Sequence, residues 1–482
     1  MGAAHFVLHE EEEAFADWIN KRLQTDKDVI HFLPLAKDGS DMYEKMDDGV
    51  ILCKMINLAA PDTIDERVLN KGKNVSIFKR HENLTLAINS AQAIGCTVIG
   101  MDSHNLQSSE GKRWMVLGLV WQVIKMFLFN QITISNVPGL VNLLREGEDI
   151  SELMKLSPEQ LLLRWVNHQL EKAGSQRTIS NFGSDIKDSE IYTDLISQIA
   201  PKNAGVNKTA MQRQDLIERA EIMLEQADKI DSRAFVTSKD VVKGQETLNL
   251  AFVANLFNNF PGLDPPAAEV DIIEETREEK MYRNWMNSLG VQPRVNYLYS
   301  DLYDGIVIFK IYDVIKAGTV NWDKVNTKYS TLPAKKYQQV LENCNYAVVL
   351  GKKLNFVLVG IAGSLNPDGT PIVESEIISW ANTKLEQGKK DISIKHFQDK
   401  VNKTALPIIH LIDVIKPGSI DYSLVKQGAT ITNEECLSNA KYAVNIARKI
   451  GAPVYALPED ISEVKHKMVM TVYASLMLAD MN

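Results

Sequence analysis

The feature that most constrains this chain is a short motif that occurs four times. A Trp, one variable residue and an Asn begin at Trp18, Trp165, Trp285 and Trp380. Each lies in an amphipathic stretch, and in Phe15–Leu23 the apolar residues follow the i, i+3, i+4, i+8 spacing of one helix face. Successive motifs lie roughly a hundred residues apart, which is too far for a solenoid unit and suits a globular domain. The motif therefore predicts four modules, numbered 1 to 4 below.

Further recurrences follow each motif. Asp48–Asn57 resembles Asp304–Tyr312, and each is predicted to be a helix with an acidic start. A turn with Pro or Gly follows, as at Ala60–Ile64, and then a helix rich in Asn and Ala, as at Glu82–Ala87. A strongly apolar closing helix, such as Trp114–Phe129, completes the module. Because a helix that is apolar on all sides should be buried on all sides, each module is predicted to wrap around its closing helix.

Composition excludes several classes of protein. A chain of 482 residues and 54.1 kDa is long enough for three or four domains. Its net charge of −9 argues against a nucleic-acid partner, since such proteins usually carry a basic domain. The longest apolar run is broken by Gln122 and Lys125, so we expect no membrane insertion. The four cysteines form no CxxC pair and are expected to be mostly buried free thiols in a reducing compartment.

The sequence also lacks the motifs of common enzymes. It contains no HExxH, no GxxxxGK[ST] and no GxSxG. The stretch Gly360–Gly363 follows an apolar run but lacks the GxGxxG spacing of a nucleotide loop. The nine His are scattered without metal-ligand spacing. We therefore expect no enzyme, no catalytic residues and no metal site.

The combined motifs resemble the calponin-homology module, and four in tandem resemble the fimbrin and plastin family of actin-bundling proteins. The strings that carry the resemblance include Ala60–Arg67, Leu248–Phe257, Arg283–Gly290, Leu341–Ala347 and Tyr455–Asp460. They occur in the family's order and cover the chain from about Glu10 to Met477. The resemblance implies an all-α fold of four calponin-homology domains arranged as two tandem actin-binding domains. Their expected bounds are residues 8–132, 157–260, 275–363 and 374–480.

One departure from the family concerns calcium. Members normally carry a pair of calcium-binding EF-hands before the first module. No D-x-[DN]-x-[DN]-G loop with Glu at its twelfth position occurs in this sequence. We therefore expect a core fragment of such a protein, with no cofactor and with actin bundling that does not respond to calcium.

A second departure lies in module 3. Modules 3 and 4 are in register from their Trp residues as far as Val359 and Val454. Module 4 then continues with its closing helix near Val464–Leu476, whereas module 3 passes through Gly360–Gly369 directly to the next module near Glu374. The closing helix of module 3 is thus predicted to be missing. Either a segment was lost from this sequence, which is the favoured interpretation, or the module carries a genuine deletion.

The resemblance implies binding of filamentous actin and cross-linking of filaments into tight bundles by two actin-binding domains in one chain. It also implies a monomeric cross-linker in the cytoplasmic actin cytoskeleton. The Pro-rich segment Pro261–Pro266 between modules 2 and 3 suits a compact, semi-rigid link between two filament sites. The alternative is a signalling scaffold or a microtubule-associated adaptor, because calponin-homology modules also serve in these roles.

In the family, actin contacts come from the first and last helices of the leading module and the first helix of the trailing module. Carried over by position, these are residues 17–24, 122–132 and 160–171, and in the second domain 280–289 and 376–385. The side chains that we expect to contact actin are Lys21, Gln24, Gln122, Lys125, Met126, Phe129, Arg164, His168, Arg283, Asn287 and Lys384. For the charged members the alternative is solvated surface, and Met126 and Phe129 could equally be core. The four motif Trp residues are assigned to core packing.

Overall fold

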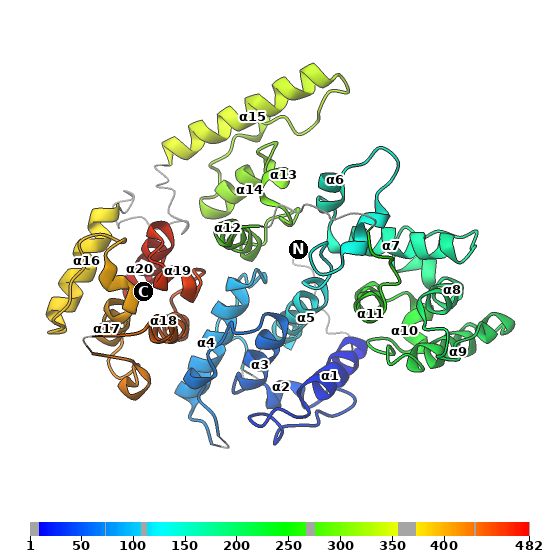
Figure 1. The fold of residues 1–482 in the computed structure, drawn as a ribbon, viewed down its shortest axis with the longest axis horizontal. Helices are drawn as coiled ribbons and strands as arrows, with labels where there is room; N and C mark the ends of the chain where they lie inside the picture. Colours follow the sequence, from blue (N-terminus) through cyan, green and yellow to red (C-terminus); the bar gives the residue numbers. More distant parts are fainter. Residues whose placement is uncertain are drawn as a thin grey trace. The chain divides into compact units, whose positions relative to one another are not determined.

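The computed structural model describes residues 9–72, 74–107, 113–266, 275–354, 373–428 and 430–481. These residues form helices joined by loops, with no strand among them, which confirms the all-α prediction (Figure 1). The chain divides into two compact units. The first comprises residues 1–46 and 107–274, and the second comprises residues 47–106 and 275–482. Module 1 contributes helices to both.

The first unit contains part of module 1 and all the described residues of module 2. Its helices are α1 (His9–Leu23), α2 (Met42–Lys45), α5 (Arg113–Phe129), η2 (Pro138–Leu143), α6 (Ile150–Met154), α7 (Pro158–Lys172), η3 (Ser184–Ile186), α8 (Glu190–Ile199), η4 (Thr209–Gln212), α9 (Leu216–Asp228), α10 (Ser238–Lys243) and α11 (Glu246–Asn259). The apolar closing helices α5 and α11 pack against each other. A capping box formed by Ser157 and Gln160 fixes the start of α7, because each side chain satisfies a backbone N–H that the helix leaves unpaired.

The second unit contains the rest of module 1 and the described residues of modules 3 and 4. Its helices are α3 (Val50–Ala59), η1 (Glu66–Val68), α4 (Ile77–Ala93), α12 (Arg277–Ser288), α13 (Leu298–Asp301), α14 (Ile306–Ile315), η5 (Trp322–Lys324), α15 (Pro333–Lys353), α16 (Glu374–Gln387), η6 (Lys400–Thr404), α17 (Leu406–Ile415), η7 (Tyr422–Leu424), α18 (Asn433–Lys449), α19 (Pro458–Ser462) and α20 (His466–Met481). Helices α16 to α20 of module 4 lie together, drawn in yellow, orange and red in Figure 1. Module 4's closing helix α20 begins two residues after the predicted start, because Val464 takes a left-handed conformation with φ 56°.

The Asn of each repeated motif closes the same structural clip. Its amide nitrogen donates to a backbone carbonyl downstream, and its amide oxygen accepts from the N–H of that same residue, at 2.6 to 2.9 Å. The pairs are Asn20 with Leu35, Asn167 with Ile179, Asn287 with Val295 and Asn382 with Ile394. The clip ties the first helix of each module to the chain that follows it. The motif therefore recurs because the fold needs a short side chain with both a donor and an acceptor.

A second Asn clip holds the Asn- and Ala-rich helix of three modules. Asn83, Asn343 and Asn439 are all fully buried. Each donates to the backbone carbonyl of a loop residue and accepts from the N–H of that residue, as Asn343 does with Asn326 at 2.9 and 2.8 Å. Each also donates to a carbonyl just before the module's apolar second helix. These three positions give a common numbering for comparing α4, α15 and α18.

Module 3 has a smaller core than its relatives in the same chain. On α15 only Asn343, Ala347 and Leu350 are buried, whereas α18 buries ten residues. Among the described residues, the buried side chains around α14 include two clusters, one that contains Phe309 and one that contains Ile311. Residues 355–372, where the closing helix was predicted to be missing, lie outside the described residues. Its loss therefore stays a prediction.

Candidate protein-binding surface

The three helices expected to make the first partner surface all belong to the first unit. Helix α1 packs on α5 through two pairs of aromatic rings. Phe15 stacks on Trp121 with ring centroids 5.8 Å apart, and Trp18 meets Phe127 edge-on at 5.3 Å. Trp18 and Trp165 are buried, as predicted, while Trp285 and Trp380 are partly buried. The aromatic pairs therefore fix α1 against α5 and leave the opposite face of α1 to solvent.

The last turn of α1 and the residue after it carry two exposed members of the expected contact set. Lys21 and Gln24 are both exposed. The Lys21 ammonium lies 2.8 Å from the Asp17 carboxylate, one helical turn earlier, and the Gln24 amide donates to the Lys21 carbonyl at 3.1 Å. An exposed pair of this kind contributes little to stability, because water already solvates both charges. Lys21 is therefore free to exchange its partner for another carboxylate.

The end of α5 is more enclosed and is tied to the start of α7. Gln122, Lys125 and Met126 are partly buried, and Phe129 is only 8% exposed. The Lys125 ammonium lies 2.6 Å from the Glu159 carboxylate and 5.2 Å from the centre of the Phe129 ring. Burial acts to raise the pKa of Glu159, but the charge of Lys125 and its hydrogen bond lower that pKa below its ordinary value. Phe129 is thus a core residue, and Lys125 is an ion-pair partner within the fold.

On α7 the expected contact residues are likewise engaged. Arg164 makes a two-pronged contact with the Glu148 carboxylate, at 2.5 and 3.3 Å, so it anchors the loop before α6 to α7. Partial burial lowers the pKa of His168, which favours the neutral imidazole at neutral pH. Its Nε2 atom is buried and has no hydrogen-bond partner among the described residues. Arg164 and His168 therefore border the surface rather than project from it.

In the second unit the structure places the remaining expected residues on α12 and α16. Arg283 pairs with Glu275 through two hydrogen bonds of 2.6 and 2.8 Å, and the Lys384 ammonium lies 2.8 Å from the Asp480 carboxylate. Asn287 is 2% exposed, and both groups of its amide are used in the motif clip. Asn287 is thus a core residue, and a direct contact between its side chain and a partner does not fit its position. The recurrence of this Asn in all four motifs was the signal that could have shown its structural role.

The described residues hold no cluster of three or more His, Cys, Asp or Glu side chains that could bind a metal ion. Among the same residues, no helix combines the length and the apolar character needed to cross a membrane. Cys53, Cys96 and Cys436 are buried free thiols, and Cys344 is partly exposed. Burial raises the pKa of the Cys96 thiol to about 12, so this side chain stays protonated at neutral pH. The described side chains of this surface therefore interact through ion pairs and apolar contacts.

Comparison with known proteins agrees with the repeated architecture. The family model of the calponin homology (CH) domain matches residues 9–129, 156–262, 276–364 and 371–482. Plastin-2 of Danio rerio is 48% identical over 520 aligned positions, which cover all of this chain and 82% of that protein. Fimbrin of Dictyostelium discoideum is 47% identical, with 100% of this chain and 82% of that protein covered. This chain belongs to the plastin and fimbrin family.

A solved structure extends the similarity to three dimensions. The crystal structure of the actin-crosslinking core of Schizosaccharomyces pombe fimbrin is similar with a TM-score of 0.81 and 36% sequence identity. The match covers 98% of this chain and 100% of that one. The fold of this family member is thus four calponin-homology domains, as predicted. The third domain match is the shortest of the four, and the alignment with Danio rerio plastin-2 has more positions than this chain has residues.

Proposed function

We propose that this chain binds actin filaments and cross-links them into bundles. The observation that carries the proposal is the match of 98% of this chain to the actin-crosslinking core of a fimbrin, together with the four calponin homology matches along this chain. Two pairs of domains in one chain offer two filament sites, and the first bound filament raises the effective concentration of the second site. The proposed setting is the actin cytoskeleton in the cytoplasm, and the role is non-enzymatic, without nucleic acid or membrane insertion.

Within this proposal the first pair of domains is the stronger filament site. Its three expected helices, α1, α5 and α7, are all described, and they lie together in the first unit. Lys21 is the most accessible basic residue of the set, with 60% of its side chain exposed. An exposed basic residue suits an acidic filament, because charges at the rim of an interface steer association and set orientation. In the second pair, no described helix stands where α5 stands in the first.

The test is co-sedimentation with actin filaments at two speeds. Pelleting at high speed reports binding, and pelleting at low speed reports bundles. The full chain is expected to pellet in both, and bundling is expected to be the same with calcium and with a chelator. Protein that remains in the supernatant at both speeds would contradict the actin proposal and favour a scaffold or a microtubule-associated role. Protein that pellets only at high speed would leave one working filament site.

A charge reversal tests the location of the first site. Lys21→Glu is expected to weaken high-speed pelleting about tenfold, since it places a like charge opposite an acidic filament. Lys202→Glu is the matched control, because Lys202 is an exposed residue of module 2 that lies outside the three expected helices. If the two variants bind actin filaments with equal affinity, the placement of the site on α1 is wrong, while the actin proposal itself stands.

A further inference from the structure

Within the second unit, module 4 binds module 1 through two lysines. Helix α4 of module 1 lies against α18 of module 4. The Glu82 carboxylate on α4 lies 3.5 Å from the Lys449 ammonium and 3.7 Å from that of Lys416. Lys449 also donates a hydrogen bond of 2.7 Å to the backbone carbonyl of Val68. This face of module 4 therefore recognises two groups of its neighbour, a carboxylate and a peptide carbonyl.

Module 3 carries lysines at the same two places. Counted from the buried clip Asn of each helix, Lys353 on α15 stands where α18 has Lys449. Lys316 directly follows α14, as Lys416 directly follows α17. Both lysines that hold the carboxylate in module 4 thus have a counterpart in module 3.

The tyrosine of this surface also keeps its position. The Tyr346 hydroxyl accepts a hydrogen bond of 3.2 Å from the Asn321 N–H, and the Tyr442 hydroxyl accepts one of 2.8 Å from the Asp421 N–H. Tyr442 is 1% exposed, whereas Tyr346 is partly exposed. The same surface is thus built in both modules, and among the described residues it is covered only in module 4.

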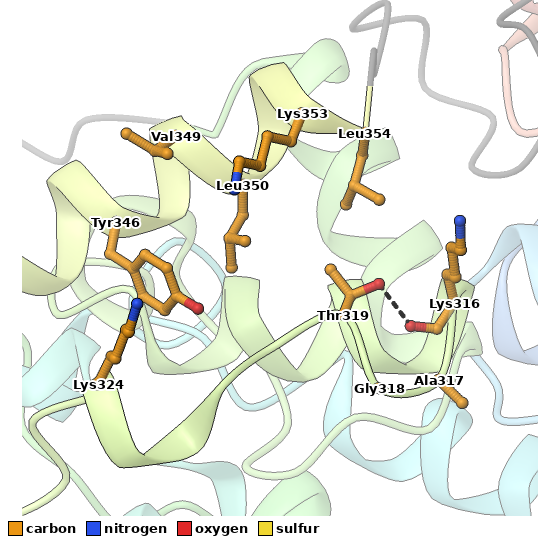
Figure 2. Close-up of a pocket in the computed structure, with 10 residues that line it drawn as sticks. All are labelled: Lys316, Ala317, Gly318, Thr319, Lys324, Tyr346, Val349, Leu350, Lys353 and Leu354. Carbon is orange, nitrogen blue, oxygen red and sulfur yellow. Dashed lines mark hydrogen bonds between the residues drawn. The ribbon is translucent and has the colours of Figure 1, made fainter.

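In module 3 this surface forms an open pocket of about 360 Å³ at the end of α15. Figure 2 shows Tyr346 and Leu350 pointing from α15 towards the loop that follows α14, with Lys316 and Lys324 on opposite sides in this view. The ammonium groups of Lys316, Lys324 and Lys353 make no ion pair with any residue that the structure describes. No Asp or Glu is among the described residues that line the pocket. The pocket therefore gathers positive charge that the described part of the fold does not neutralise.

Apolar side chains also line this pocket. Val349 is 50% exposed, and Leu350 and Leu354 lie beside it in the lining. Module 4 has the polar Asn445 at the place of Val349, so the module 3 surface is more apolar at this position. Positive charges around apolar side chains suit a segment of protein better than a small anion, because burial of the apolar area adds to the attraction.

We propose that this pocket of module 3 binds an acidic helical segment of another protein. A carboxylate of that segment lies between Lys316 and Lys353, as Glu82 of module 1 lies between Lys416 and Lys449. The segment is helical because the carboxylate that module 4 binds is itself carried by a helix, α4. An apolar residue beside the carboxylate covers the exposed apolar side chains of the pocket.

This partner is additional to the proposed actin filament. The pocket lies outside α12 and α16, the helices of the second domain pair that are expected to contact actin. Three ammonium groups repel a second copy of the same pocket, so the chain itself is expected to remain a monomer. Because the lysines lie at the surface, the association is expected to be weak, in the micromolar range, and sensitive to salt.

The test is fluorescence anisotropy of a peptide titrated with the purified full chain, without actin and at low salt. The probe is a blocked, alanine-based helical peptide with Glu along one face and Leu beside it, labelled with a neutral dye. The matched peptide has Gln in place of every Glu. The Glu peptide is expected to bind at least about tenfold more tightly than the Gln peptide, and the difference is expected to shrink as salt rises.

Charge reversals test whether the peptide binds at module 3. Lys316→Glu and Lys353→Glu are each expected to weaken binding of the Glu peptide about tenfold, since each places like charges together. Lys336→Glu is the matched control, because it makes the same charge change at an exposed residue of α15 that lies about 25 Å along the helix from Lys353. A peptide with Lys in place of Glu is expected to bind the Lys353→Glu chain more tightly than the unmodified chain, because opposite charges then meet again.

The proposal is wrong if the Glu and Gln peptides bind equally, or if Lys353→Glu leaves binding of the Glu peptide unchanged. It is also wrong if inorganic phosphate binds at the pocket and the Glu peptide does not, since the ligand would then be a phosphate group rather than a protein segment. Circular dichroism melting of every variant separates a lost contact from a lost fold. Because no actin is present, failure here leaves the filament proposal untouched.

Discussion

Modules 3 and 4 follow the same sequence pattern, yet their Asn- and Ala-rich helices differ in how deeply they are packed. Val444 on α18 is 1% exposed, and Val348 at the matching place on α15 is 56% exposed. The same position in module 1, Ile88 on α4, is 7% exposed. In module 4 the neighbouring residue Ala440 is fully buried, whereas its counterpart Cys344 is partly exposed. One side of α15 that its sister helices bury is therefore open to solvent.

The difference separates the features that the local sequence specifies in both modules from the depth of packing, which differs between them. Module 3 keeps both Asn clips and the capping box of its first helix, formed by Thr276 and Glu279. It also keeps the left-handed Gly305 that starts its apolar helix, as Gly49 does in module 1. These devices act over short distances, so the helices form and are joined as in the other modules. Module 3 differs from module 4 in that its helix α15 is packed less deeply.

The largest expected effect comes from placing a charge at Val444 of α18 or at Val348 of α15. These residues occupy matching positions but differ in burial. Val444→Asp puts a carboxylate in an apolar site and is expected to destabilise module 4 by more than about 3 kcal/mol. Val348→Asp places the same group in water and is expected to change stability by less than about 0.5 kcal/mol. Urea unfolding followed by circular dichroism, with hydrogen exchange read in each module, measures both.

The same two variants also test whether Val348 is less buried than Val444 in solution. If Val348→Asp proves as damaging as Val444→Asp, then Val348 is covered in solution, and module 3 possesses a packed closing segment. That result would contradict the predicted loss of the helix. Val348→Thr, which keeps the shape of the side chain without adding a charge, is the control for a change in helix propensity.

A second, smaller difference in stability is expected when the motif Trp is replaced in module 2 and in module 3. Trp165 is fully buried, packs edge-on against Phe257 and donates to the Pro261 carbonyl at 2.7 Å. Trp285 is partly buried at the edge of the cluster that contains Val295. Trp165→Ala is expected to cost about 4 kcal/mol, and Trp285→Ala about 2 kcal/mol, because the first leaves a larger cavity and also removes the hydrogen bond from the indole to the Pro261 carbonyl.

The measurement for the Trp variants is the urea midpoint of the mutated module, followed by hydrogen exchange. Trp165→Phe is the control, since it keeps most of the apolar volume and removes only the hydrogen bond. Equal losses for Trp165→Ala and Trp285→Ala would mean that module 3 packs its first helix as firmly as module 2 does.

The sequence was enough to predict the fold class and the four modules, since amphipathic periodicity and a recurring Trp and Asn are local signals. The extent of the closing helix α5 was predicted to within one residue. The same signals assigned the motif Trp residues to the core, and Trp165 shows why: its ring fills the space between two helices. Periodicity is reliable here because each apolar stripe is buried by its own module.

The sequence was a weaker guide to the candidate site. Asn287 and Phe129 belong to the core, because the clip and the end of α5 need them there. Neither fact is visible from helix position alone, since a first or last helix buries one face and exposes another. The α4–α18 contact could not be predicted either, because it joins residues such as Glu82 and Lys449 that are distant in the chain.

The smallest expected effect compares two lysines on the first helices of modules 1 and 4 and separates folding from binding. Lys384 is 29% exposed and pairs with Asp480, which also accepts a hydrogen bond of 3.1 Å from the Trp380 indole. Lys384→Ala is therefore expected to cost about 1 kcal/mol of stability, since Asp480 loses its charge partner. Lys21→Ala removes an exposed pair and is expected to cost less than about 0.5 kcal/mol, as measured by urea unfolding.

The two lysines should then rank in the opposite order when actin pelleting is measured. The ion pair of Lys21 with Asp17 contributes little to the stability of the fold. Loss of the Lys21 side chain is therefore expected to weaken filament binding while the urea midpoint stays unchanged. Lys384 is held within module 4, so its loss is expected to move the urea midpoint more than the binding. If Lys21→Ala lowers the midpoint as much as Lys384→Ala does, then Lys21 is part of the structural framework, and the first filament site must be sought on α5 and α7.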